Sequence, residues 1–405
     1  MTKMKYFLIT VLAFLLMIST LKAQIINKDL NQFKKIKWEF KTKGAIHGSP
    51  VLSENVLYFG SADHHIYSID KITGELIWKY KTGGPIYSTP ALSGDKVFFT
   101  SMDGNLYALN KNKGTLLWKF LSPKDKQKDI WDYHNCSPLA ADSKVYFGNG
   151  SGTFFALNEE TGKTVWQFQT NGIIHTTPII NKENIYFGNF EGYFYALNKN
   201  SGKEKWKFNT VGQKWFPKGA VQQGAAIREN VLYFGSRDFN IYALNAETGT
   251  GMWNMFEQGS WIISTPTVKD TLILFGTSDT HHFYAMDARY GRVKWKKKIS
   301  LNVFGQCETG KELAYFGSLN GKLYAVNLEN GETAWEFQTE ESKKKWDEIF
   351  DENDELSKSF FERNENNGLK IYEEIHQLGS IVSKPLLDKG ILYFTSMNGK
   401  IYAIE

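Results

Sequence analysis

Two adjacent pairs of histidines are the most obvious candidates for metal chemistry in this chain of 405 residues. His64-His65 and His281-His282 offer imidazole nitrogens, which are common metal ligands. Neighbouring side chains on a strand point to opposite faces, so each pair could give only one ligand to a shared site unless a turn rotated them. The pairs also fall in repeats that lie three steps apart in the ring inferred below. We therefore expect histidines of local turns and no metal site.

The two cysteines are the only residues that could form a disulfide. Cys136 and Cys307 fall in repeats on opposite sides of the same ring, whereas a disulfide requires Cα atoms within about 7 Å of each other. We therefore expect two free, buried thiols. The chain also contains no G-x-S-x-G nucleophile motif, no phosphate-binding glycine loop and no C-x-x-C metal motif. We identify no catalytic constellation, which favours a protein that is not an enzyme.

One block of sequence recurs throughout the chain and must position all of these residues. Each copy contains a V-Y-F-G-like segment, a polar turn, a Y-A-L-N-like segment, a T-G turn and a segment with a tryptophan. The recurring tryptophans are about 40 to 48 residues apart, and they are Trp38, Trp78, Trp118, Trp166, Trp206, Trp253, Trp295 and Trp335. Tight Gly- and Asn-containing turns between short apolar segments indicate four antiparallel strands in each copy. Such a unit, repeated at this period, predicts a β-propeller.

Prolines support the same architecture. Six of them, which we assign to the first strand of a copy, are Pro50, Pro90, Pro138, Pro178, Pro266 and Pro385. The first strand is the inner edge of a blade, where a missing N–H group breaks no ladder. The residues before these prolines are mostly small, which suits strands that converge on an axis.

The two ends of the chain predict how the ring closes. Residues 36–42 match a fourth strand with no first three strands before it, and the last copy, from about residue 379 to 405, has three strands and no fourth. The N-terminal strand should therefore complete the C-terminal blade. The prediction is an all-β fold: a single eight-bladed β-propeller of four-stranded antiparallel blades over residues 36–405, after a lead-in at 24–35.

Residues 1–23 have the pattern of a secretory signal peptide. Lys3 and Lys5 precede an apolar segment from Tyr6 to Ile18, and Ala23 is a small residue at the cleavage position. An uncleaved N-terminal anchor is the alternative, although Lys22 ends the apolar segment early. No cysteine follows that segment, so we expect no lipid anchor, and no transmembrane segment elsewhere. The expected location is the periplasm, the extracellular space or the cell surface.

Composition narrows the class of partner. The chain is 42% hydrophobic, which excludes a disordered protein. Its 48 basic and 43 acidic residues give a net charge of +5, and three of the basic residues lie in the predicted signal peptide. A balance this small gives no general attraction to nucleic acid or to anionic membranes. We therefore expect no nucleic-acid partner.

The motif Y-A-L-N-x-x-T-G-x-x-x-W, nearly unchanged at residues 195–206 and 242–253, resembles the tryptophan-docking repeat of pyrroloquinoline-quinone (PQQ) propellers. The resemblance covers residues 36–405 and implies that each tryptophan packs between blades against the T-G turn of a neighbour. The family includes quinoprotein dehydrogenases and the non-catalytic BamB-type propellers of outer-membrane β-barrel assembly. Length and the eight-fold count are closer to the BamB type. The chain departs from that type in having no lipid-anchoring cysteine and in carrying a long insertion before the last blade.

A PQQ-dependent enzyme would need a particular set of residues near the axis. Calcium is held there by carboxylate and amide oxygens, a carboxylate acts as base, and aromatic groups surround the quinone. The residues that we place near the axis are His47, Tyr87, Asn135, His175, Gln222, Gln223, Gln306 and Glu308. Glu308 is the single carboxylate among them, and we expect it to be a residue of a wet channel. We expect no cofactor, with PQQ and calcium as the less favoured alternative.

Insertions at 121–135 and 209–223 fall in connections from a fourth strand to the next first strand, where a repeat protein is usually customised. Aromatic residues there, with Lys124, Lys126, Lys128, Lys214 and Lys218 nearby, predict an exposed, mildly basic rim suited to a protein or glycan partner. The alternative is that these rings cap the hydrophobic ends of blades. The candidate rim residues are Trp131, Tyr133, His134, Trp215, Phe216 and Trp261.

The largest insertion is 340–377, with 12 acidic and 6 basic residues. Its apolar residues at helical spacing are Trp346, Ile349, Phe350, Leu356 and Phe360. They predict an amphipathic helix over one end of the channel, with a stop at Asn366-Asn367-Gly368. The insertion is either a lid or partner-binding helix, or a solvated loop that docks on its own propeller.

The favoured function is an exported, monomeric, non-enzymatic scaffold that binds a protein partner. The family resemblance implies a role in outer-membrane or envelope protein assembly. The alternatives are a quinoprotein dehydrogenase, intact or degenerate, and a propeller that binds a glycan or small ligand.

Overall fold

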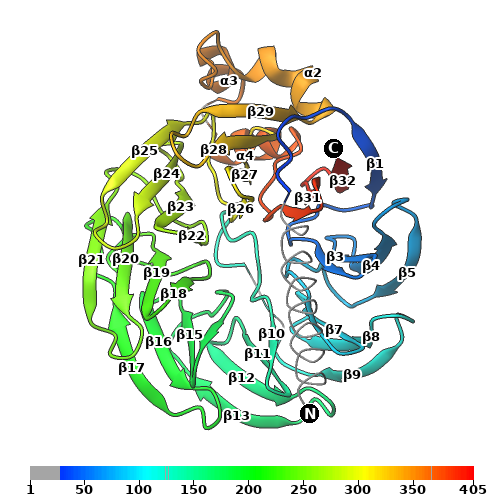
Figure 1. The fold of residues 1–405 in the computed structure, drawn as a ribbon, viewed down its shortest axis with the longest axis vertical. Helices are drawn as coiled ribbons and strands as arrows, with labels where there is room; N and C mark the ends of the chain where they lie inside the picture. The colour runs from blue at the N-terminus through cyan, green and yellow to red at the C-terminus, as the bar shows by residue number, and fades with distance from the viewer. Residues whose placement is uncertain (1–27, 124, 126, 366) are drawn as a thin grey trace, which may run out of the picture.

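Eight four-stranded antiparallel sheets form a closed ring around a central axis (Figure 1). The structure is a computed structural model that describes residues 28–123, 125, 127–365 and 367–405. The predicted signal peptide lies outside the described residues. The arrangement confirms the predicted eight-bladed propeller, and we number the blades 1 to 8 in chain order.

Each of the first seven blades is formed by four consecutive strands, ordered from the axis outwards. The strands of blades 1 to 4 are β2 (Val51–Ser53), β3 (Val56–Gly60), β4 (His65–Asp70), β5 (Leu76–Lys81), β6 (Ala91–Ser93), β7 (Lys96–Thr100), β8 (Leu106–Asn110), β9 (Leu116–Phe120), β10 (Leu139–Ala141), β11 (Lys144–Gly148), β12 (Thr153–Asn158), β13 (Thr164–Gln169), β14 (Ile179–Asn181), β15 (Asn184–Gly188), β16 (Tyr193–Asn198) and β17 (Glu204–Asn209). The strands of blades 5 to 7 are β18 (Ala226–Arg228), β19 (Val231–Gly235), β20 (Asn240–Asn245), β21 (Gly251–Phe256), β22 (Thr267–Lys269), β23 (Leu272–Gly276), β24 (His282–Asp287), β25 (Val293–Lys298), β26 (Glu308–Thr309), β27 (Leu313–Gly317), β28 (Lys322–Asn327) and β29 (Thr333–Gln338).

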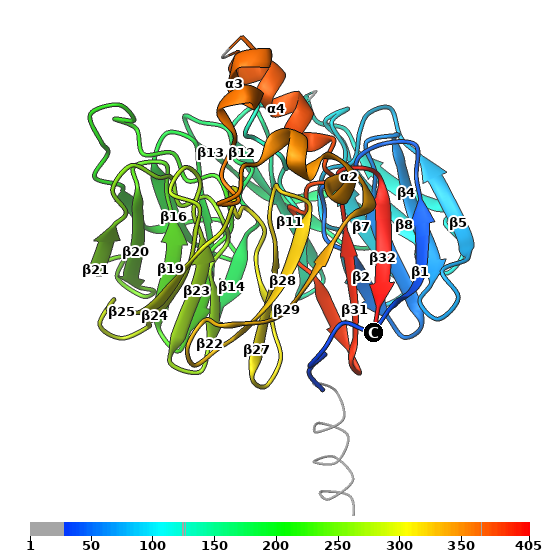
Figure 2. The ribbon, with the colours of Figure 1, turned by 90° about the horizontal axis from the view of Figure 1, so that it is seen from above.

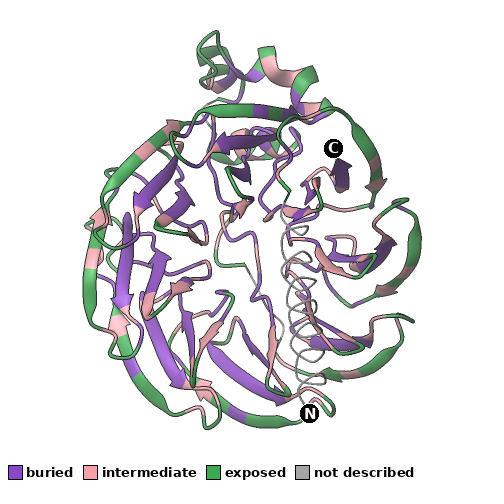
Figure 3. Cartoon of the chain, viewed as in Figure 1, coloured by how far each residue is buried: buried purple, intermediate pink, exposed green. Residues whose placement is uncertain are grey.

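The two middle strands of each blade supply most of the core. In blade 1, β3 and β4 are buried at nearly every position, because both faces of the sheet pack against neighbouring blades. The outer strand β5 is exposed except at alternate positions, which include Trp78. The same gradient, from buried middle strands to an exposed outer strand, recurs around the ring (Figure 3).

The inner strands begin one residue later than the sequence indicated. Each of the six prolines lies immediately before its first strand, as Pro50 precedes Val51 at the start of β2. Because proline has no N–H group, pairing starts at the residue after it.

The small residues before those prolines link neighbouring blades. The backbone N–H of Lys384 in blade 8 donates to Ser49 Oγ in blade 1 at 2.8 Å. The N–H of Ser49 donates to Thr89 Oγ1 in blade 2 at 2.9 Å, and the N–H of Thr89 donates to Ser137 Oγ in blade 3 at 2.9 Å. The small hydroxyl side chains around the axis therefore fit the narrow space between the inner strands, and they also link neighbouring blades through hydrogen bonds.

The recurring tryptophans join the outer parts of the blades. In seven cases the indole N–H donates to a backbone carbonyl in the turn between the third and fourth strands of the next blade, at 2.9–3.3 Å. The glycine of that turn lies against the ring. Gly74 has φ +76°, and a Cβ atom there would lie 2.7 Å from Cδ2 of Trp38. Each turn therefore needs glycine both for its backbone and for its contact with tryptophan.

The ring closes as predicted, between the two ends of the chain. β1 (Ile36–Lys41) pairs antiparallel with β32 (Lys400–Ile404), and with β31 (Ile391–Thr395) and β30 (Leu386–Asp388) it forms blade 8. Trp38 of β1 packs against the core between blades 8 and 1.

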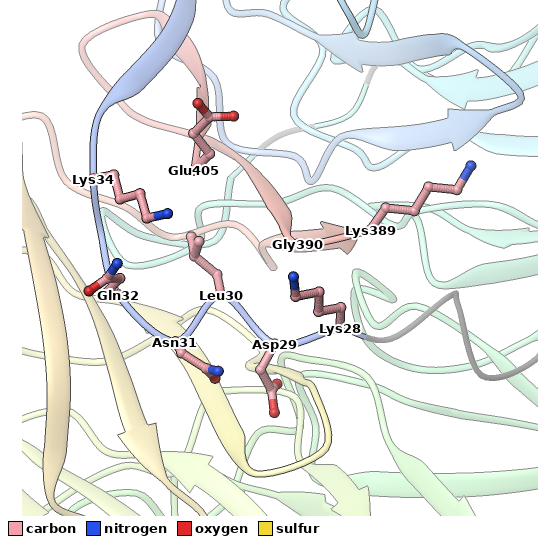
Figure 4. Close-up of a pocket in the computed structure, with 9 residues that line it drawn as sticks. All are labelled: Lys28, Asp29, Leu30, Asn31, Gln32, Lys34, Lys389, Gly390 and Glu405. Carbon is pink, nitrogen blue, oxygen red and sulfur yellow. The ribbon is translucent and has the colours of Figure 1, made fainter.

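A second closing contact is made by the lead-in. Blade 8 has no turn between its third and fourth strands, since these come from opposite ends of the chain. The indole N–H of Trp335 in blade 7 donates instead to the carbonyl of Leu30 at 2.6 Å. Phe33 packs edge-on against Phe337, with ring centroids 5.5 Å apart. The lead-in also lines a cleft of about 420 Å³ beside the C-terminal residue Glu405 (Figure 4).

The insertion before blade 8 forms three helices, and the prediction of one helix was wrong. They are α2 (Glu340–Ile349), α3 (Lys358–Arg363) and α4 (Gly368–His376). Asn367 does not end a helix, because its side chain accepts hydrogen bonds from the first N–H groups of α4 and so caps its start. The helices lie on the face of the ring opposite the lead-in (Figure 2). No helix among the described residues has the length and apolar character needed to cross a membrane.

Replacing Trp38 with alanine should lower the free energy of unfolding by about 3–5 kcal/mol, because a large aromatic ring in the closing contact is lost. Urea denaturation followed by circular dichroism measures the change. The control is Trp215→Ala, which removes a ring that is 70% exposed and should change stability by less than about 0.5 kcal/mol. An unchanged midpoint for Trp38→Ala would count against its role in closure.

Candidate binding face

The face that carries α2, α3 and α4 also carries the long connections between blades, and we call it the insertion face. The connection between blades 2 and 3 crosses the mouth of the central channel on this face. We call residues 127–135 of this connection, together with Asp125, the strap. Its backbone is tied to several blades: His47 Nδ1 in blade 1 donates to the carbonyl of Tyr133 at 2.8 Å, and the Gln222 amide in blade 5 donates to the carbonyl of Trp131 at 2.5 Å.

Two ionic contacts, one buried and one partly buried, also hold the strap. His175 of blade 4 lies between two strap carboxylates, with Nδ1 2.9 Å from Asp132 Oδ2 and Nε2 3.2 Å from Asp125 Oδ1. The Arg237 guanidinium in blade 5 binds the Asp129 carboxylate through both of its terminal nitrogens. Paired and hydrogen-bonded in this way, the buried charges avoid the large cost of isolated ones.

The histidines around the strap differ in charge. Burial disfavours the charged form of His175, but its hydrogen bonds to Asp125 and Asp132 outweigh that effect and raise its pKa to about 10. Burial lowers the pKa of His47 to about 3 and that of His376 to about 4. Burial also lowers the pKa of His134. At neutral pH, His175 is therefore charged and the other three are neutral.

An apolar layer covers the strap. Tyr133, Phe304 and Val382 form one cluster with Ile349 of α2 and Phe360 of α3. α4 is tied to the strap by its Tyr372 hydroxyl, which donates to the carbonyl of Ile130 at 2.6 Å. The insertion helices therefore pack on the strap and on the inner ends of the blades.

The predicted rim residues do not share one environment. Trp215 is 70% exposed, and Lys214 Nζ lies 4.7 Å from the centre of its ring. Tyr133 is buried, contrary to the expectation of an exposed rim, because the insertion helices cover it. His134 is partly buried and donates to the carbonyl of His47 at 3.1 Å. Trp131, Phe216 and Trp261 are partly buried and line a pocket described below. Lys124 and Lys126 lie outside the described residues.

The residues near the axis make contacts within the chain. Beneath the strap, the channel holds a cavity of about 70 Å³. Glu308 is held in an ion pair with Lys384 at 3.1 Å. Of the other residues that we placed near the axis, His175 and Gln222 bind the strap, and the described residues contain no group of three or more His, Cys, Asp or Glu arranged to bind a metal.

The two cysteines and the two histidine pairs, the other candidates for chemistry, do not come together in one site. Cys136 and Cys307 are free and buried, as predicted, and burial raises the pKa of each thiol to about 12. His65 Nδ1 lies 3.4 Å from Asp63 in its own turn. His282 Nδ1 lies 3.7 Å from Glu257. Each histidine pair lies where a turn meets the third strand of its blade, with His65 first in β4 and His282 first in β24.

The ionic contacts of the strap were not predicted from the sequence. Asp129 and Arg237 are 108 residues apart, and nothing in the repeat pattern pairs them. One signal was available in the turns between second and third strands. Where blades 2 and 8 have Met-Asp-Gly-Asn and Met-Asn-Gly-Lys, blade 5 has Arg237-Asp238-Phe239-Asn240. Arg237 replaces the methionine of those turns and Phe239 replaces their glycine, so a cation and a ring here indicate a specialised contact.

The fold and the closed channel together define a PQQ-like β-propeller of the eight-bladed type. A family model described as outer membrane protein assembly factor BamB matches residues 33–196, 130–255 and 191–405. The chain therefore belongs to this family. No curated protein matches the sequence significantly.

Solved structures show the same fold at low sequence identity. BamB from Moraxella catarrhalis is similar with a TM-score of 0.68 and 16% identity, over 92% of this chain and 99% of that chain. A europium-containing methanol dehydrogenase is similar with a TM-score of 0.69 and 14% identity, over 91% and 93%. The quinohemoprotein alcohol dehydrogenase ADHIIG from Pseudomonas putida HK5 has a TM-score of 0.68 and 13% identity, over 92% and 76%.

Replacing His175 with glutamine should destabilise the protein more at pH 6 than at pH 10. The folded-state pKa of about 10 lies above the unfolded value of about 6.5, so the stabilisation by charged His175 is complete below pH 6.5 and is lost as the pH rises through 10. At pH 6 we expect a loss of about 3–5 kcal/mol, because two buried carboxylates lose their cation.

Urea unfolding of both proteins across this pH range measures the difference. The control is His64→Gln, since the His64 ring makes no hydrogen bond within the described part of the chain. A pH-independent effect of His175→Gln would contradict a charged His175.

Proposed function

We propose that this protein is an exported, monomeric scaffold without enzymatic activity, and that it holds a protein partner on its insertion face during outer-membrane or envelope protein assembly. The observation that carries the proposal is the strap. It fills the axial site where a dehydrogenase of this fold would need space for a cofactor, and buried ion pairs hold it there. Membership of the BamB-type family supports the assembly role.

The insertion face offers surface for such a partner. Trp215 presents a large exposed ring on the connection between blades 4 and 5. Tryptophan is among the residues that dominate binding energy at protein interfaces. The outward-facing side of α2 and α3 adds exposed acidic residues, among them Asp347, Glu348 and Glu362. The insertion face therefore carries an exposed aromatic ring and, elsewhere on it, charged helices, and both suit a protein partner.

A quinoprotein dehydrogenase is the second candidate, because enzymes of that class share the fold. Calorimetric titration of the mature protein with PQQ and calcium separates the two. We expect no binding heat, because the cavity beneath the strap is smaller than the cofactor and no calcium ligands converge there among the described residues. Stoichiometric, calcium-dependent binding would overturn the scaffold proposal.

Replacing Trp215 with alanine should weaken binding of the protein partner at least tenfold, since an interface tryptophan typically contributes more than about 1.4 kcal/mol. Partners are captured from an envelope extract on the immobilised mature protein, identified by mass spectrometry and titrated in purified form. The control is Tyr290→Ala, which removes a ring that is 59% exposed in a turn on the opposite face. Equal loss with both variants, or with neither, would place the interface elsewhere.

A further inference from the structure

An aromatic pocket of about 260 Å³ opens on the insertion face between blades 5, 6 and 7. Its apolar walls come from separate segments of the chain, namely the strap, the connection between blades 4 and 5, a turn of blade 5, and the connections that precede blades 6 and 7. The five rings are Trp131, Phe216, Phe239, Trp261 and Phe304. None of these segments is close in sequence to all the others, so the pocket exists only in the assembled ring.

The rings meet at steep angles. Phe216 and Trp261 have centroids 5.1 Å apart and an interplanar angle of 83°. Trp131 and Phe304 have centroids 6.1 Å apart and an angle of 77°. Rings that meet in this way form adjoining walls of a box, with flat apolar surfaces turned to its interior. A ligand inside can therefore pack a face against one ring while its edge meets another.

Two polar side chains line the same pocket. The Asn302 side chain is buried, with 8% exposure, and its amide makes no hydrogen bond within the described residues. Asp279 accepts a hydrogen bond from Ser278 Oγ at 2.7 Å and is exposed at the pocket. A buried polar group without a partner is costly, so a ligand that pairs with Asn302 is favoured.

Charge restricts the ligand further. The Arg237 guanidinium lies 4.6 Å from the centre of the Trp261 ring and covers one of its faces, so a ligand cation cannot stack on that face. The Asp129 carboxylate already pairs with the Arg237 charge, so Arg237 offers no free charge to an anion. The Asp279 carboxylate also disfavours an anion. A neutral ligand that donates a hydrogen bond to Asp279 suits these surroundings.

Hydrogen bonding excludes a purely apolar ligand. An aliphatic or phenyl side chain would fill the box but leave the Asn302 amide unpaired. The pocket needs a ligand that can exchange hydrogen bonds with Asn302 and donate to Asp279. Hydroxyl groups do both. A sugar ring combines such hydroxyl groups with apolar C–H faces that pack on aromatic rings.

We infer that this pocket binds one pyranose ring of a neutral glycan. The volume lies just below the range of about 300–1,000 Å³ that holds drug-sized ligands, which restricts the box to one ring, with the rest of a glycan outside. This site is separate from the proposed function, which depends on the exposed Trp215. Its occupant gives the insertion face a second ligand, of the carbohydrate class.

The test measures binding of simple pyranosides to the mature protein by calorimetry and by saturation-transfer NMR. The probes are methyl glucopyranoside, methyl galactopyranoside and N-acetylglucosamine, each at millimolar concentrations. We expect at least one to bind. Asn302→Leu keeps the size and removes the amide, and it should raise the Kd about tenfold, the effect of one hydrogen bond of about 1.4 kcal/mol. Trp261→Phe reduces the aromatic surface against which the sugar packs, and it should also raise the Kd.

Matched controls show whether the sugar binds in this pocket and through its ring. Trp215→Phe alters a ring outside the pocket and should leave the Kd for the sugar unchanged. The sugar-binding test is therefore independent of the protein-partner test, which depends on Trp215. Xylitol, an open-chain polyol, has hydroxyl groups but no ring face and should not bind. If Asn302→Leu fails to fold, the Trp261→Phe result decides.

Three outcomes would overturn the inference. The first is the absence of binding by all three pyranosides. The second is tighter binding of tetramethylammonium, which would mark a cation site. The third is tighter binding of p-cresol, which would mark a pocket for an aromatic side chain of a protein.

Discussion

A buried indole N–H needs an acceptor, and this requirement joins the blades of the ring. Seven tryptophans find that acceptor in the third turn of the next blade, where glycine allows the close approach. The eighth, Trp335, faces a blade whose outer strand comes from the other end of the chain, so no such turn exists. The lead-in replaces it with the carbonyl of Leu30. Closure of the propeller therefore depends on both the pairing of β1 with β32 and the path of the residues before β1.

The strap adds a different kind of constraint at the centre. Inside a low-dielectric channel, a charge is tolerated only when it is paired, and an imidazole without a partner carboxylate stays neutral. The opposite pKa directions of His175 and His47 follow from this rule. The ionic contacts hold the strap from below, and the apolar side chains of the insertion helices cover it from above. The channel mouth is closed by both.

The two faces of the ring have different roles as a result. The turns of one face, together with the lead-in, serve the contacts between blades. The insertion face carries the strap, three helices, the exposed Trp215 and the aromatic pocket. These features occupy connections that the blades do not need for their own hydrogen bonds, so they could vary while the ring was kept.

The sequence by itself determined the fold. The number of blades, the closing strand and the separation of Cys136 from Cys307 all follow from a period of about 40 residues, because each copy repeats the same local requirements for strands, turns and tryptophan docking. The tertiary structure alone decided the site. Asp132 meets His175 across 43 residues, Asp129 meets Arg237 across 108, and Asn367 begins a helix where the sequence indicated an end. These contacts lie in connections that do not repeat, and their partners come from blades that only closure of the ring brings together.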